Sequence, residues 1–452
     1  MKSILAELEV NYRIGGRSNV PVTAMVPALT PVATAPILAP NADADKNLID
    51  VMVIAKKKAE DTKKRLEHEL RVEGEKLEKA KKEELEERKR LEALKSKAEI
   101  ERLEAARKME EEVRLQAAKK KMAEEEEKRR QEEHEKLEKD LADFVNKESA
   151  YVLNFGYQGI LSIVETLVSK NDVIVYDIDS HACIVDGVRL HVGKRFTFQH
   201  NDIESLEKNL KRAEKIVEKT GGGILVISEG VFGMRGEQGK IKEIIQLKKK
   251  YDFRLLVDDA HGFGTLGSDG SGVGNEQDIN DDIDVYFATF AKSLASTGAF
   301  VAGSKNVIKF LKYNMRSQVF AKSLQMQLVI GAIKRLEILK NEPLHREKLW
   351  KNVKALQSGL IERGFDIGTT KSCVTPVFLK GDVLEAMVLV KDLREKYGIF
   401  CSIVVYPVIP KGLILLRLIP TATHTLNDIN ETLDSFLAIR DKLEEGYYKK
   451  IP

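Results

Sequence analysis

The sequence predicts an α/β fold with a mainly parallel sheet, preceded by a long charged helix and followed by a smaller C-terminal α+β domain. From about residue 149, short apolar runs alternate with amphipathic helical stretches, which is typical of parallel sheets covered by helices on both faces. The charge is concentrated in residues 61–140, which carry 25 Lys/Arg and 26 Asp/Glu in 80 positions. The length of 452 residues favours two or three domains.

The N-terminal third is expected to contribute no chemistry. Residues 1–54 form a predicted disordered or extended arm, because five prolines between positions 20 and 40 exclude a helix there. Residues 55–140 form a predicted long helix, rich in Lys, Glu, Arg, Ala and Leu, with opposite charges at i,i+4 spacing. Its leucines keep no sustained heptad, so a lone solvated helix and a loose coiled coil both stay open.

Residues 141–338 form the predicted large domain. Its expected strands are the apolar runs 173–178, 223–228, 254–260, 284–290 and 299–303. Its clearest expected helices cover 202–219 and 239–251. Residues 339–452 form the predicted small α+β domain, with strands near 373–380, 401–408 and 413–419 and a closing helix over 426–443.

The composition argues against several classes of partner and site. The net charge is only +3, and the charged block sums to −1, which argues against nucleic acid as a partner. Three distant cysteines without a CxxC pair suggest neither zinc nor disulfides, and no metal site is expected. Without a signal peptide or an apolar stretch of about 18 residues, we expect a cytoplasmic protein with no transmembrane segment.

Two polar residues follow neighbouring apolar runs, where ligands bind in sheets of this type. Asp258 ends the run 254–260, and a buried aspartate needs a cationic partner. Lys292 follows the run 284–290, and a desolvated lysine is a nucleophile for carbonyls. Alone, each is more often a turn or surface residue. Together they are the two groups that pyridoxal 5'-phosphate (PLP) requires.

Six runs of sequence occur in an order that is specific to one family. They are HEKLEKDLADF (134–144), DSHACIVDGVRL (179–190), SEGVFGMRGEQG (228–239), VDDAHGFGTLGSDGSG (257–272), ATFAKS (288–293) and LRLIPTATHT (416–425). From about residue 134 onward the chain thereby resembles the α-oxoamine synthases, which are fold-type I PLP-dependent acyltransferases. The residues in these runs are most similar to those of bacterial serine palmitoyltransferase-like sequences.

The resemblance implies four catalytic residues that also bind the cofactor. Lys292 resembles the lysine that bonds covalently to PLP, and Asp258 resembles the partner of its pyridine nitrogen. His261 resembles the histidine near the phenolic oxygen of the cofactor, and His181 the histidine stacked on its ring.

Five further residues take binding roles by the same resemblance. Thr289 resembles a hydroxyl contact to the cofactor phosphate, and Gly156 and Tyr157 resemble the step whose backbone N–H groups meet that phosphate. Glu229 matches an acidic position near the cofactor. Arg417 resembles the arginine that binds the substrate carboxylate, a task for which a bidentate guanidinium is suited.

The implied reaction condenses an amino acid, expected to be serine, with an acyl-CoA thioester and releases CoA and CO2. A homodimer, a place in sphingolipid biosynthesis and possible peripheral contact with membranes accompany that expectation. Glycine C-acetyltransferase and 8-amino-7-oxononanoate synthase activities are the alternatives within the family.

The sequence departs from the family pattern in three places, one of which is the step Phe155-Gly156-Tyr157, where the usual following asparagine is missing. The charged helix replaces the family's N-terminal part, including a GSGGSR-like loop that helps form the acyl-CoA site. Gly233 also stands where many relatives have serine. An inactive PLP lobe fused to a helical interaction segment is therefore a third alternative.

Overall fold

The computed structural model describes residues 78–79, 82–83, 97–406, 409 and 411–449. The predicted arm, and residues 55–96 of the predicted charged helix apart from 78–79 and 82–83, lie outside these ranges. The first long element is helix α3, Lys97–Phe144. Among the described helices, none is both long and apolar enough to cross a membrane.

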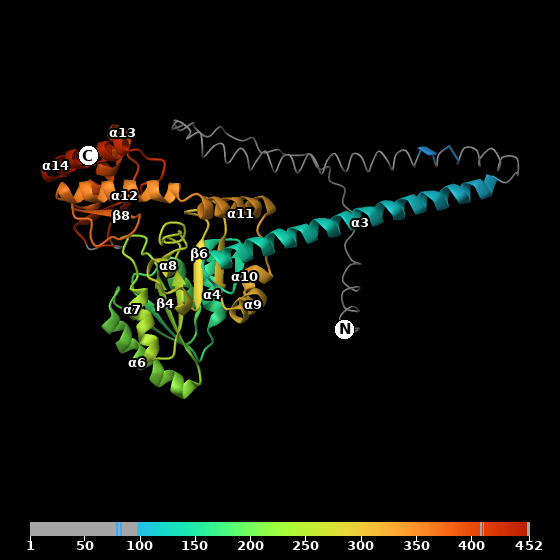
Figure 1. Ribbon diagram of the computed structural model, residues 1–452, viewed down its shortest axis with the longest axis horizontal. Helices are drawn as coiled ribbons and strands as arrows, with labels where there is room; N and C mark the ends of the chain where they lie inside the picture. Colours follow the sequence, from blue (N-terminus) through green and yellow to red (C-terminus); the bar gives the residue numbers. More distant parts are fainter. Residues whose placement is uncertain (1–77, 80–81, 84–96, 407–408, 410, 450–452) are drawn as a thin grey trace, which may run out of the picture. The chain divides into compact units, whose positions relative to one another are not determined.

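Helix α3 has an exposed stretch and a buried end. Every residue from 106 to 129 is exposed, as its composition predicts, and the coiled-coil alternative stays a prediction. The helix continues beyond the expected end at 140 to Phe144, and Leu137 and Leu141 near this end are fully buried. These last turns pack against helix α11 (Met326–Asn341) and strand β1 (Ser149–Leu153). The end of α3 is therefore part of the core (Figure 1).

Replacing Leu141 with Ala is expected to lower the free energy of unfolding by about 2–5 kcal/mol, because it leaves a cavity in this core. Leu115→Ala on the same helix is the matched control, since Leu115 is 55% exposed, and we expect a change within about 0.5 kcal/mol. Urea denaturation of the full chain measures both. Equal effects of the two substitutions would show that the end of α3 does not belong to the core.

A seven-stranded sheet forms the centre of the molecule, in the order β1-β7-β6-β5-β4-β2-β3. Neighbouring strands are parallel from β6 to β3, whereas β7 is antiparallel to both β6 and β1. The strands after β1 are β2 (Val173–Asp177), β3 (Lys194–Phe198), β4 (Ile224–Glu229), β5 (Arg254–Asp258), β6 (Val285–Thr289) and β7 (Ala299–Gly303). All five predicted strands of this domain are confirmed, and β1 and β3 are additional.

Helices cover both faces of this sheet, which explains the nearly continuous apolar runs of its strands. Leu225 and Leu256 face one apolar cluster, whereas their neighbours Val226 and Val257 face the other. The helices are α4 (Gly156–Leu167), α5 (Ala182–Leu190), α6 (Ile203–Thr220), α7 (Ile241–Gln246), α8 (Val273–Glu276), α9 (Lys305–Asn314), α10 (Arg316–Val319) and α11. Short 3₁₀ turns occupy Leu247–Lys249 (η1) and Asn280–Asp282 (η2). The helix predicted over 239–251 is thus shorter, since a 3₁₀ turn replaces its end.

Local capping explains where the best-predicted helices begin and end. Asp202 caps α6 by accepting from the backbone N–H of Ser205, and Gly221 ends it at a φ of 70°. Helix α14 (Leu426–Glu444) begins with a capping box between Thr425 and Asp428. Both predicted helices are therefore confirmed to within about a residue.

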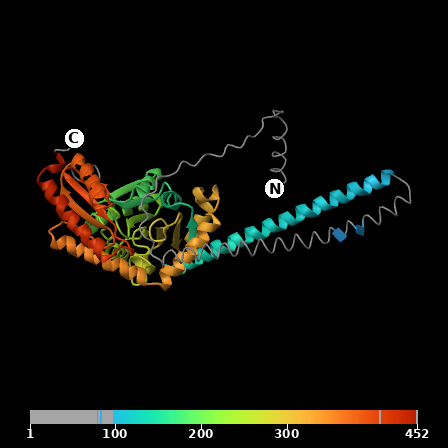
Figure 2. The same ribbon diagram turned by 90° about the horizontal axis from the view of Figure 1, so that it is seen from above.

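A second, three-stranded antiparallel sheet with its own core forms in the C-terminal region, in the order β8-β10-β9. Its elements are α12 (Leu344–Glu362), β8 (Thr375–Lys380), α13 (Val383–Tyr397), β9 (Ser402–Val404), β10 (Leu413–Leu418), α14 and η3 (Tyr447–Lys449). Figure 2 shows the helices of this region gathered together, and α14 packs against both α12 and α13. The predicted strands and the α+β character are confirmed, and a domain boundary at residue 339 stays a prediction.

Candidate active site

The carboxyl ends of parallel strands bring the predicted site residues to one edge of the sheet. Glu229 ends β4 and pairs in register with Asp258, which ends β5. Thr289 ends the next strand, β6, and Lys292 follows it by three residues. Arg417 comes from β10 of the second sheet.

Asp258 is a buried carboxylate without a cationic hydrogen-bond partner among the described residues. Its Oδ1 accepts only from the backbone N–H of Ala260, at 3.0 Å. Burial raises the pKa of Asp258 to about 6, although the hydrogen bond from Ala260 and the charge of nearby Lys292 both act to lower it. A protonated pyridine nitrogen would supply the missing donor, so this residue fits the part of the cofactor that it was predicted to bind.

Lys292 is exposed to solvent, yet the protein atoms packed around its amino group lower its pKa. The carboxylates of Asp258 and Glu229 act in the opposite direction, and the guanidinium of Arg417 lowers the pKa further. A lysine with a lowered pKa is more often neutral, which both bonding to an aldehyde and accepting a proton require.

Glu229 holds the turn that carries His181. Its Oε1 accepts from the backbone N–H of His181 at 2.5 Å. Burial, followed by repulsion from Asp258, raises the pKa of Glu229 well above its usual value. The side chain of His181 caps α5, where Nδ1 accepts from the backbone N–H of Cys183 at 3.3 Å.

The imidazoles of His181 and His261 both lie near Lys292 and Arg417. Burial first, and then these two cations, lower the pKa of each ring, well below its usual value for His261. Both rings are therefore neutral at pH 7. A neutral ring can stack on an aromatic cofactor or donate a single hydrogen bond to it.

The start of α4 offers an anion site next to Thr289. No side chain caps the N-terminus at Phe155, so the N–H groups of the first turn are not used by a cap. A Cβ on Gly156 would lie 3.0 Å from Oγ1 of Thr289, so only a glycine leaves this space open. The ring of Tyr157 lies edge-on to His181, with centroids 6.4 Å apart, and its hydroxyl donates to Asp186. This arrangement suits a phosphate group.

Arg417 is oriented for a ligand rather than for a protein partner. Its Nε is buried, and no described residue accepts a hydrogen bond from it. Burial lowers its pKa, yet a guanidinium keeps its charge at neutral pH. An unpaired buried donor close to Lys292 fits the predicted role of binding a carboxylate.

Two features of the site go beyond the sequence-based prediction. A Cβ on Gly233 would lie 2.2 Å from Nε2 of His261, so the imidazole occupies the space that a serine would need. His200 pairs with two carboxylates beside the turn that leads to His181. A lone histidine carries no clear signal in the sequence, although the following Asn201 and Asp202 mark a turn there.

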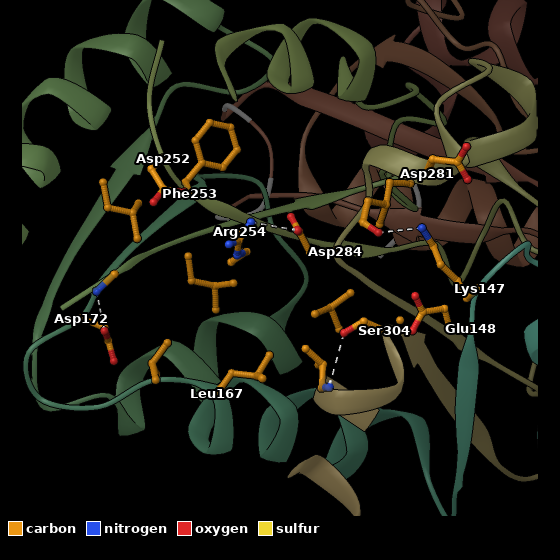
Figure 3. A pocket seen from close by; sticks show the side chains of 18 of the residues that line it. Lys147, Glu148, Leu167, Asp172, Asp252, Phe253, Arg254, Asp281, Asp284 and Ser304 are labelled. Carbon is orange, nitrogen blue, oxygen red and sulfur yellow. Dashed lines mark hydrogen bonds and ion pairs between the residues drawn. The ribbon is translucent and has the colours of Figure 1, made fainter. Parts of the chain in front are cut away.

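A cavity of about 760 Å³ lies at the opposite edge of the sheet, between the amino ends of β4, β5 and β6. Figure 3 shows an ion pair between two of its side chains, Arg254 and Asp284 at 3.6 Å, whereas Lys147 donates to the backbone carbonyl of Ile283 and Asp172 accepts from a backbone N–H. None of the predicted site residues lines it. Among the described residues, no group of three or more His, Cys, Asp or Glu could hold a metal ion.

Comparisons with known proteins show which family the chain resembles. Residues 99–436 match the family model of aminotransferase class I and II. A cysteate-C-fatty acyltransferase of Capnocytophaga ochracea is 69% identical over 318 residues, which are 70% of this chain and 76% of that protein. A serine palmitoyltransferase of Sphingobacterium spiritivorum is 36% identical over 311 residues, or 69% and 76% of the two chains.

A solved structure gives the same fold. Serine palmitoyltransferase from S. paucimobilis with a bound PLP–myriocin aldimine superimposes with a TM-score of 0.64 and 33% identity, over 68% of this chain and 76% of that one. The similar stretch is about as long as the roughly 320 residues expected from the sequence. The chain therefore belongs to aminotransferase class I and II and, within it, to the α-oxoamine synthases, which are PLP-dependent C-acyltransferases.

Proposed function

We propose that this chain condenses L-cysteate with a fatty acyl-CoA thioester, releasing CoA and CO2. The observation that carries the proposal is the 69% identity to a cysteate-C-fatty acyltransferase, against 36% to a serine palmitoyltransferase. The expectation of serine is corrected accordingly. The new C–C bond joins the acyl carbonyl to the α carbon of cysteate, and the product keeps the sulfonate. Sphingolipid biosynthesis is therefore not part of the proposal.

Bound PLP supplies an electron sink for the negative charge that develops at the α carbon. Asp258 would hold the proton on the ring nitrogen, which its burial and its lack of a cationic hydrogen-bond partner among the described residues favour. The N–H groups at the start of α4 that no side chain caps would hold the phosphate together with Thr289, whose hydroxyl donates to the carbonyl of Gly298 in this structure. His181 would stack on the ring and His261 would bind its phenolic oxygen, both as neutral imidazoles.

Two residues act on the amino acid itself. Arg417 binds its α-carboxylate through the donors that lack a protein partner. Lys292, with its lowered pKa, is the amine that would hold the cofactor, and once the amino acid has taken its place it would move protons at the α carbon. Glu229 fixes the backbone of His181 and so maintains the stacking position.

The proposal includes a homodimer. Phe155, Tyr157 and Phe320 are 55%, 48% and 84% exposed near the start of α4. The side chain of Asn154 donates to the carbonyl of Lys322 at 2.6 Å, which brings these two segments together. Exposed aromatic side chains that gather in this way favour a surface covered by a second subunit.

A substrate comparison tests the proposed function. The PLP-loaded full chain is incubated with palmitoyl-CoA and with L-cysteate, L-serine, glycine or L-alanine in turn, and the release of CoA and CO2 is followed. We expect kcat/KM for L-cysteate to exceed that for L-serine at least about tenfold. The reason is that one charge-assisted contact to the sulfonate, which serine lacks, is worth about that factor. A preference for serine, glycine or alanine would overturn the choice of substrate, and cofactor binding without CoA release would support the inactive-lobe alternative.

A further inference from the structure

His200 lies between two carboxylates at the carboxyl edge of the large sheet. Its Nδ1 is 3.0 Å from Oδ1 of Asp177, and its Nε2 is 2.6 Å from Oε2 of Glu237. A carboxylate oxygen can only accept at neutral pH, so both ring nitrogens carry hydrogen. The geometry therefore requires an imidazolium.

Asp177 connects His200 to the turn that carries His181. It ends β2 and is fully buried. Besides His200, its carboxylate accepts from the backbone N–H groups of Asp179 and Asn201, both at 2.9 Å. Its carbonyl accepts from the N–H of Ser180 at 3.1 Å, directly before His181. The carboxylate of Asp177 therefore sets the path of the chain into the site.

Glu237 connects His200 to the loop that packs on His261. The backbone N–H of Phe232 donates to the carbonyl of Glu237 at 2.9 Å, and the Phe232 ring lies edge-on to His200 with centroids 4.4 Å apart. The next residue, Gly233, packs directly on the His261 imidazole. The other oxygen of Glu237 accepts from Thr369 in the C-terminal region at 2.6 Å.

We propose that His200 is a positioning residue for the acyltransferase reaction: as an imidazolium it ties the His181 turn to the loop that packs on His261. It thereby fixes the two site imidazoles relative to each other without touching either substrate. This inference rests on the roles assigned to His181 and His261 under the proposed function.

The groups that face His200 keep it charged. Burial opposes the charge, but Asp177, Glu237 and Asp179 outweigh burial and raise the pKa of His200 above its usual value. Asp179, 3.9 Å from Nδ1, is also 3.7 Å from Arg235. Because the pKa is raised, the stabilisation is complete below the ordinary histidine pKa of about 6.5. It is lost as the pH rises through the pKa of folded His200.

The test compares His200→Gln with His191→Gln in the PLP-loaded full chain. Glutamine can donate to one carboxylate but cannot carry charge. His191 is the matched control, because its ring is buried as well and, among the described residues, hydrogen-bonds only to the carbonyl of Asp172 at the opposite edge of the sheet. The measurements are kcat/KM from pH 6 to 9.5 with the best amino acid substrate and the absorbance change of the bound cofactor on addition of that amino acid.

For His200→Gln we expect kcat/KM at pH 7 to fall about 10- to 100-fold while the cofactor still binds. A fall of this size is expected when the site imidazoles move by about 1 Å. We expect kcat/KM of the wild type and of His191→Gln to decline as the pH rises through the pKa of His200, and we expect this decline to be absent in His200→Gln. An alkaline decline that is unchanged in His200→Gln, or lost equally in His191→Gln, would overturn the proposal.

A second measurement does not depend on turnover. NMR of histidine-labelled, cofactor-free protein follows each ring through its titration, with His200→Gln identifying the signal. We expect His200 to titrate above pH 6.5, and Glu237→Gln to lower that value by removing one carboxylate. A signal that titrates at or below 6.5 overturns the inference, whichever amino acid the enzyme uses.

Discussion

Lys292→Ala is expected to abolish the covalent attachment of PLP and to lower kcat/KM by about a thousandfold or more. The lysine is the bonding amine and the group that moves protons at the α carbon, and loss of such a group costs about 10²–10⁴-fold from proton transfer alone. The absorbance near 420 nm that marks the bonded cofactor should be missing. Absorbance spectra and a CoA-release assay measure the two effects.

Lys309→Ala is the matched control, because Lys309 is an exposed lysine on α9 away from the site. It should keep both the absorbance and the activity. A normal cofactor spectrum in Lys292→Ala would remove this lysine from the mechanism.

Arg417→Ala is expected to raise KM for the amino acid about 100-fold while the cofactor remains bound. Truncation removes a charge-assisted, bidentate contact in a buried position, an effect of about 2–5 kcal/mol. Arg417→Lys keeps the charge but not the planar fork, so we expect an intermediate increase of about tenfold. The change in cofactor absorbance on titration with the amino acid measures binding directly.

Arg254→Ala provides the comparison for a guanidinium outside the site. Arg254 is exposed at the amino end of β5, where it pairs with Asp284. Its removal should leave KM unchanged. If Arg417→Ala binds the amino acid as tightly as the wild type, another residue must hold the carboxylate.

The strands that carry the site could be predicted because they are buried on both sides. Such strands read as continuous apolar runs, as β4 and β5 do. Strand β3, KRFTF, lies at the edge of the sheet, and only its last residue is buried, so no apolar run marks it. His200 follows this unpredicted strand, which is why it was not linked to the site.

The direction of a strand is harder to predict from the sequence than its position. The apolar run of β7 does not show that β7 is antiparallel to β6. The length of the connection does carry that information, since residues 290–298 are too few for a helical crossover between parallel strands. Asp258 and Lys292 could be predicted from their positions after apolar runs, whereas the roles of the other seven site residues rest on the resemblance. What the structure adds is that Arg417, from a different sheet, lies near Lys292.

Helix α3 contains two stretches that we expect to unfold differently. Between residues 106 and 129 every side chain is exposed, and helix propensity and i,i+4 ion pairs such as Arg114–Glu110 support the helix, so we expect this stretch to open and reclose without disturbing the enzyme. From Leu137 onward the same helix can unwind only together with β1 and α11. The border between two independently unfolding units therefore falls within a helix, and a division of the chain at secondary-structure ends would miss it.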